Sequence, residues 1–136
     1  MNEKNIQTLF SKWMQTEGIQ VFDSVAVELK LVKGKSFAFN RMPDHQIEAL
    51  KQVAGKGHHY KIQDMAAISG YANPKPYDCY TLKGEAFIGI CFYVPRKRKT
   101  LYLIKVQDFI GMKINADRKS ATESMCIIAS ERVIDL

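Results

Sequence analysis

The chain has 136 residues, with 20 Lys and Arg against 14 Asp and Glu and a formal net charge of +6. This length fits one domain that buries its own core without disulfides or a structural metal. The positive surplus favours a polyanionic partner, nucleic acid first and an anionic membrane surface second.

The first half of the chain predicts two helices that flank a strand. Apolar residues at helical spacing predict a helix over 3–16, which Gly18 is expected to end. A strand follows over 24–32, and after a basic glycine-centred turn the residues 36–39 are expected to return as its short hairpin partner. A second helix is expected to open at Pro43 and Asp44 and to close at Gly55 and Gly57.

The second half predicts several strands and a final helix. Segment 65–76 holds two prolines and a glycine and is expected to be a loop. The run 86–94 is almost wholly apolar, as expected of a central strand buried on both faces. A Ser-x-x-Glu pattern that begins at Ser120 predicts the start of the last helix. The other predicted strands cover 60–64, 77–82 and 101–106.

This order of elements predicts an α/β (α+β mixed) fold in one domain over 1–136, with one mixed sheet flanked by helices. Cys79 and Cys91 fall within predicted strands and are expected to be small core residues. The odd number of distant cysteines favours a reducing cytosol. No apolar stretch approaches about 18 residues, so we expect no transmembrane helix and no membrane partner. The length and the lack of a targeting signal fit a cytoplasmic protein of phage or prokaryotic origin.

The strand from Val25 to Val32 carries two opposite charges, Glu28 and Lys30, on one face. Charged groups on a half-buried face are costly unless they are paired or functional. Metal-dependent nucleases use this Glu-x-Lys pattern, in which the acid binds the cation and the ammonium steers water or neutralises the phosphate. The alternative is an ordinary ion pair on an exposed strand, worth about 0–1 kcal/mol.

Other polar residues add to the candidate site. Asp78, beside a strand and after Pro76, is a candidate second carboxylate for Mg²⁺, or else an aspartate that bonds its own turn. Gln46, in the first turn of the second helix, is a candidate to bind water or phosphate, or else a solvated polar residue. The three histidines match no zinc-ligand spacing.

Two basic turns are candidate contacts for a nucleic-acid backbone. Their charged residues are Lys33, Lys35, Arg96, Lys97, Arg98 and Lys99. Like charges in a row repel one another unless they are solvated or neutralised, so a solvated turn is the alternative. Phosphate contacts of this kind position a protein without reading sequence.

The residues around the Glu-x-Lys pattern resemble the RecU family of Holliday junction resolvases, in the PD-(D/E)XK nuclease superfamily. The resemblance covers about two thirds of the chain and is carried by Glu28-Leu29-Lys30, the lysine-rich turn, Ser36 to Phe39, His45 to Val53, Ile90 to Phe92, Leu101 to Leu103 and Arg118 to Ser120.

The resemblance implies a restriction-endonuclease-like fold and a Mg²⁺-dependent endonuclease, with Mn²⁺ as a substitute, that cuts four-way DNA junctions as a homodimer. It implies that Glu28 and the backbone carbonyl of Leu29 bind metal, that Lys30 assists the attacking water, and that Gln46 lines the site. Glu3 and Gln7 on the first helix are further candidates for the metal shell, and Arg118 and Lys119 for DNA contact.

The chain departs from the family pattern in its second acid. The family places an aspartate on the strand before Glu-x-Lys, whereas here the first helix leads almost directly to Glu28. We expect Asp78, at the end of an insertion of about 25 residues, to supply the missing carboxylate. The alternatives are a related nuclease for flaps, single strands or duplexes, and a non-catalytic nucleic-acid-binding domain.

Overall fold

Four strands form the main sheet of the computed structural model, which describes residues 1–62 and 77–136. Their order across the sheet is β1 (Val25–Val32), β5 (Glu85–Phe92), β6 (Thr100–Lys105) and β8 (Arg132–Asp135). β1 pairs parallel with β5, and the other two pairings are antiparallel. The loop predicted over 65–76 lies outside the described residues.

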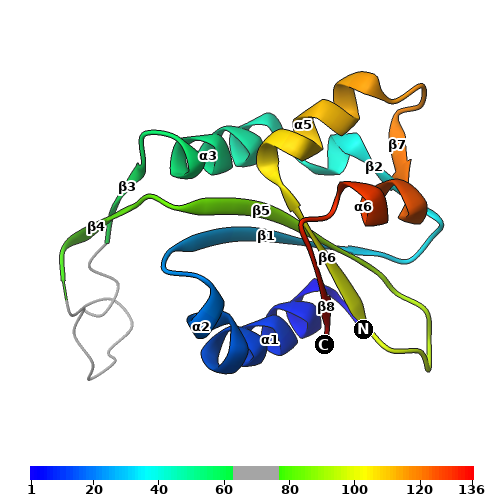
Figure 1. Ribbon diagram of the computed structural model, residues 1–136, viewed down its shortest axis with the longest axis horizontal. Helices are drawn as coiled ribbons and strands as arrows, with labels where there is room; N and C mark the ends of the chain where they lie inside the picture. The colour runs from blue at the N-terminus through cyan, green and yellow to red at the C-terminus, as the bar shows by residue number, and fades with distance from the viewer. Residues whose placement is uncertain (63–76) are drawn as a thin grey trace.

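Helices cover both faces of this sheet, which confirms the predicted fold class (Figure 1). α1 (Glu3–Trp13) lies on one face. The other face is covered by α3 (Asp44–Ala54), α5 (Val106–Asn115) and α6 (Glu123–Ala129). In the described part of the chain, no helix is long and apolar enough to cross a membrane.

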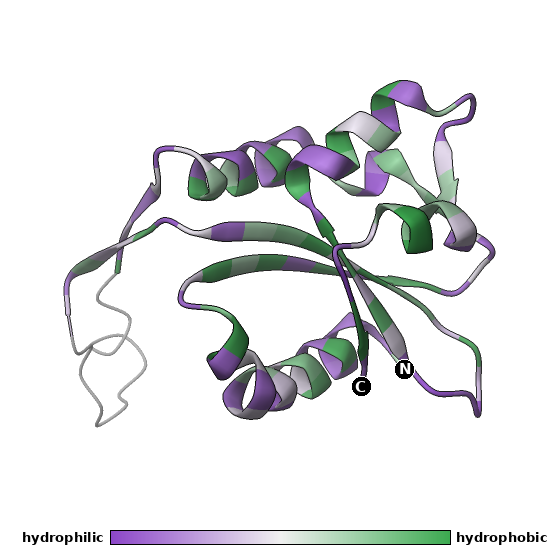
Figure 2. Ribbon diagram, in the orientation of Figure 1, coloured by the Kyte–Doolittle hydropathy of each residue, from purple (hydrophilic) through white to green (hydrophobic). Residues whose placement is uncertain are grey.

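Two apolar clusters hold these layers together, one on each face of the sheet. Leu29 and Leu31 of β1 pack into the cluster that contains Ile6 and Phe10 of α1. Val32 packs into the opposite cluster, under α3 and α5. Hydrophobic residues accordingly concentrate along the main strands (Figure 2). Because side chains alternate along a strand, the even-numbered positions of β1 face the α3 layer.

The first helical segment is longer than its sequence pattern predicts. Gly18 does not end it, because the chain continues through a π-helical turn η1 (Met14–Gly18) into α2 (Ile19–Val21). A Cβ atom at Gly18 would lie 2.8 Å from Cζ3 of Trp13. The glycine therefore makes room for the tryptophan inside the helix instead of terminating it.

The prediction that residues 36–39 pair with β1 is wrong. β2 (Ser36–Ala38) pairs antiparallel with β7 (Ser120–Thr122) in a separate small sheet. Phe37 is fully buried there, and its ring lies 6.3 Å from that of Phe109. Burial of this ring under α5 draws the segment away from β1, and the 3-10 turn η2 (Phe39–Arg41) follows it.

The start of the last helix also differs from the prediction. Ser120 lies in β7, and Thr122 is the capping residue, whose Oγ1 accepts from the backbone N–H of Met125 at 3.3 Å. The short strand β8 that ends the chain was not predicted, although it completes the main sheet.

A second small sheet consists of the antiparallel pair β3 (His58–Lys61) and β4 (Cys79–Leu82). This ribbon projects beyond the end of the main sheet (Figure 1). Cys79 is exposed on it, so the prediction of a core cysteine is wrong there. Cys91, in β5, is buried as predicted.

The close approach at Gly84 gives a test of the packing where β1 and β5 begin. A Cβ atom there would meet the Ser24 backbone, with Ser24 C only 2.8 Å away. We expect Gly84→Ala to lower the free energy of unfolding by about 1–3 kcal/mol in urea denaturation.

Gly111→Ala is the matched control, because nothing lies within 4 Å of its Cβ position. In the middle of α5 it should raise stability by about 0.5–1 kcal/mol. Equal stability of the two variants would contradict this packing.

Candidate functional site

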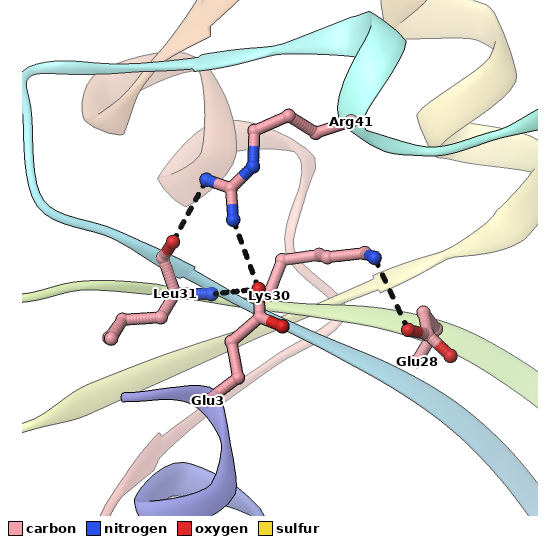
Figure 3. A network of polar contacts seen from close by, with 5 residues as sticks. All are labelled: Glu3, Glu28, Lys30, Leu31 and Arg41. Atoms are coloured by element: carbon pink, nitrogen blue, oxygen red, sulfur yellow. Dashed lines mark hydrogen bonds and ion pairs between the residues drawn. The ribbon is translucent and has the colours of Figure 1, made fainter. Parts of the chain in front are cut away.

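The candidate site lies on β1, which forms an edge of the main sheet. Glu28 and Lys30 are paired through Oε1 and Nζ at 3.3 Å, on the face that α3 covers (Figure 3). The Lys30 side chain is only 12% exposed and the Glu28 side chain 35%. The structure therefore places an ammonium and a carboxylate together on a partly covered face of the strand.

The open edge of β1 exposes backbone groups as well. The carbonyls of Ser24 and Val32 accept from β5-side amides, at 3.1 Å from Glu85 and 2.7 Å from Tyr93. Backbone groups alternate in direction along a strand, so those of Leu29 and Leu31 point away from β5. In the described part of the chain no strand pairs with this outer edge, so the carbonyl predicted to bind metal, that of Leu29, faces it.

One end of this open edge is closed by a clamp of two side chains, Glu3 and Arg41 (Figure 3). The backbone N–H of Leu31 donates to Glu3 Oε1 at 3.3 Å, and Arg41 Nη1 donates to the Leu31 carbonyl at 2.8 Å. Arg41 Nη2 bonds the same Glu3 oxygen at 3.0 Å. The planar fork of the guanidinium makes both contacts at once. Nothing in the local sequence pattern singled out Arg41.

The clamp also fixes how α1 meets the edge. α1 runs opposite in direction to β1 (Figure 1), so one turn beyond Glu3 brings Gln7 towards the level of Leu29. Gln7 is exposed. Glu3, by contrast, has one carboxylate oxygen engaged by the clamp.

Gln46 contributes a buried oxygen from the helix that lies over this face. It follows Pro43 in the first turn of α3, which packs against β1. Its Oε1 atom is buried and has no hydrogen-bond partner among the described residues. An orphaned buried acceptor is costly unless a donor or a cation satisfies it, which fits the predicted role of Gln46 in lining a site.

Asp78 is not brought to Glu28. It precedes β4 on the projecting ribbon, where its carbonyl accepts from Ile62 N–H at 2.8 Å. The four residues of β4 alone span about 13 Å. Carboxylates that share one cation at ligand distances near 2 Å lie far closer than that. Asp78 was inferred to be the second carboxylate from the order of residues along the chain, which carries no information on distance. We therefore leave Asp78 out of the candidate site.

Basic residues from three segments gather at the end of the sheet where β1 and β5 finish. Because these strands are parallel, the turns that carry Lys33, Lys35 and Arg96 to Lys99 leave from the same end. Lys119 is tied to that end, since its carbonyl accepts from Phe39 N–H at 3.0 Å. Arg118 and Lys119 also line a cleft of about 460 Å³ with Lys113, which sequence reasoning missed.

Two further polar side chains on the α3 face are hydrogen-bonded to each other. The Tyr102 hydroxyl donates to Glu123 Oε2 at 3.0 Å. Burial, together with this hydrogen bond, raises the pKa of Tyr102 to about 12. Tyr102 therefore remains protonated, and its hydroxyl occupies Oε2 of Glu123.

No family model, no curated protein and no solved structure matches the chain. Among the described residues, no three His, Cys, Asp or Glu side chains form a group able to hold a metal ion. Among the candidate residues, Glu28 and Glu3 bring carboxylates to β1, and Glu3 Oε1 is already engaged by Leu31 and Arg41.

The clamp is tested by removing its guanidinium. We expect Arg41→Ala to lower the free energy of unfolding by about 1–2 kcal/mol, because the edge carbonyl loses a charged donor and a half-exposed ion pair is broken. Arg41→Lys should recover only part of this loss, since an ammonium lacks the fork geometry. Urea denaturation measures both changes. Lys51→Ala, which breaks the exposed pair with Glu48, is the control and should change stability by less than about 0.5 kcal/mol.

Proposed function

We propose that the chain is a divalent-cation-dependent DNA endonuclease that acts on four-way junctions, as the resemblance to the RecU family implies. The observation that carries the proposal is the Glu28–Lys30 pair on an edge strand, in which the Lys30 side chain is only 12% exposed. A partly exposed ion pair contributes little to stability, about 0–1 kcal/mol. A chemical role explains why these charges stand in an otherwise apolar strand.

We expect the cation to be Mg²⁺ or Mn²⁺. Mg²⁺ keeps several waters and is held by one or two carboxylates together with substrate phosphates. Glu28 would supply the carboxylate and Leu29 the backbone carbonyl, and the orphaned oxygen of Gln46 comes from the helix over the same face. When bound, the cation lowers the pKa of a coordinated water and screens the phosphate charge.

The role of Lys30 follows from its setting. Its ammonium is held by Glu28 at 3.3 Å, and its side chain is only 12% exposed. A fixed positive charge in such a place stabilises the negative charge that develops on a phosphate in the transition state. Lys30 also orients the attacking water by hydrogen bonding.

The basic end of the sheet would hold the DNA backbone. Lys33, Lys35 and Arg96 to Arg98 are exposed there, as are Arg118 and Lys119. Contacts of this type are independent of sequence and weaken steeply with salt. Resolution of a junction needs two symmetric cuts, which a twofold homodimer supplies.

Two other functions stay open as outcomes of experiment. A nuclease for flaps, single strands or duplexes would share the site and differ in the DNA it cuts best. A non-catalytic binding domain would cut no DNA and would gain no thermal stability from millimolar Mg²⁺.

The site assignment is tested with paired substitutions. We expect Lys30→Met and Glu28→Gln each to lower the rate of Mg²⁺-dependent junction cleavage by roughly 100-fold or more, because each removes charge at the reacting phosphate. Junction binding should stay nearly unchanged, since the basic turns are intact. Cleavage of labelled junction, flap, single-stranded and duplex DNA, each with a binding assay, measures both effects.

The chain offers a matched control pair on α3. Glu48 and Lys51 form an exposed ion pair at 3.7 Å, so Glu48→Gln and Lys51→Met make the same chemical changes away from the site. Both should cleave like the parent chain. Full activity in Lys30→Met would refute the site.

A further inference from the structure

The projecting pair of strands β3 and β4 carries an aromatic face that no part of the candidate site uses. The register pairs Tyr60 with Tyr80 and His58 with Leu82, and directly opposed residues of an antiparallel pair share a face. We call His58, Tyr60, Tyr77 and Tyr80 the aromatic ribbon.

The rings of the aromatic ribbon form a continuous series. The His58 and Tyr60 ring centroids lie 4.1 Å apart. Tyr60 and Tyr80 are stacked, with centroids 5.1 Å apart and an interplanar angle of 20°. Tyr77 meets Tyr80 edge to face at 6.3 Å. The rings therefore pack against one another in the protein alone, without a bound partner.

This series is exposed rather than buried. Tyr60, Tyr80 and Tyr77 are 37%, 42% and 55% exposed. Among the described residues, none of these rings belongs to either core cluster. Packing of the fold therefore does not account for their presence, and exposed aromatic clusters mark binding surfaces.

Charge around the ribbon indicates the class of partner. Lys56 and Lys83 are exposed in the turns at the base of the two strands, and Lys61 is exposed on β3 on the opposite face from Tyr60. Aromatic rings flanked by cations fit single-stranded nucleic acid, because every base has a face to stack and every nucleotide has a phosphate. An apolar protein partner would leave these lysines without a counterpart.

We propose that the aromatic ribbon binds unpaired bases of the DNA by stacking. The inference rests on the proposed function in one respect, since it names the part of that DNA which the ribbon holds. Strands β3 and β4, which carry the aromatic ribbon, adjoin the end of the main sheet where β1 begins. The basic turns lie at the end where β1 finishes. The Glu28–Lys30 pair lies on β1 between these two ends, so a strand of DNA held at both would run along β1.

The experiment measures binding alone. Fluorescence anisotropy in EDTA, which prevents metal-dependent cleavage, compares a fluorescein-labelled oligothymidine with a blunt duplex of equal length. We expect Tyr60→Ala and Tyr80→Ala each to weaken binding of the single strand by about 5- to 150-fold. Affinity for the duplex should change little, because its bases are already stacked. Tyr80→Phe keeps the ring and should bind like the parent.

Salt dependence separates stacking from charge. Lys83→Ala, in the exposed turn after β4, should lower the slope of log affinity against log salt by about 0.7, the value for one lost phosphate contact on a single strand. The tyrosine variants should keep the parent slope. Ile19→Ala, which trims a 70% exposed apolar side chain on α2, is the matched control and should have no effect.

Several results would overturn the proposal. They are no single-strand binding by the parent chain, unchanged binding in both tyrosine variants, or equal losses for single strand and duplex. Thermal melts confirm folding, which these exposed substitutions should not disturb. If ribbon variants bind normally while Lys30→Met stops cleavage, only the ribbon proposal fails. If Lys30→Met cleaves normally while ribbon variants lose single-strand binding, only the nuclease site fails.

Discussion

The parallel pairing of β1 with β5 is the constraint on which the other parts of the structure depend. Parallel neighbours cannot be joined by a tight turn, so the chain must cross back over the sheet. Here that crossing contains α3 and the projecting ribbon. It places α3 over the face that displays Glu28 and Lys30, the basic turns at one end of the sheet and the aromatic ribbon at the other. One pairing thereby sets the relative positions of the Glu28–Lys30 pair, the basic turns and the aromatic ribbon.

The same pairing leaves β1 at an edge, and the protein closes that edge only in part. An open edge with free backbone groups is a template for aggregation. Glu3 and Arg41 occupy both backbone groups of Leu31, and the guanidinium also lies over the Phe37 ring at 5.2 Å. The clamp thus ties α1, β1 and the turn after β2 together, while the edge at Leu29 stays open.

Local patterns in the sequence predicted the elements that carry the site, whereas contacts between distant residues could not be predicted. The strand with Glu28, the helix from Asp44 and the buried strand β5 follow from periodicity, which neighbouring residues alone determine. The pairing of β2 with β7, the role of Arg41 and the exposure of Cys79 depend on partners far along the chain. The position of Asp78 also depends on distant contacts, and the structure places it on the projecting strands before β4.

The chemistry proposed for β1 requires an edge strand. On an inner strand such as β5, backbone groups point to a neighbour on either side, and no carbonyl is left for a ligand. On β1 the residue between Glu28 and Lys30 presents its carbonyl outward, while the two charged side chains stand on one face. On the proposed function, the carboxylate and the ammonium of β1 and the outward carbonyl between them would act together. This would account for the charges in β1, whereas the matching stretch of β5, Ile88-Gly89-Ile90, is apolar and buried.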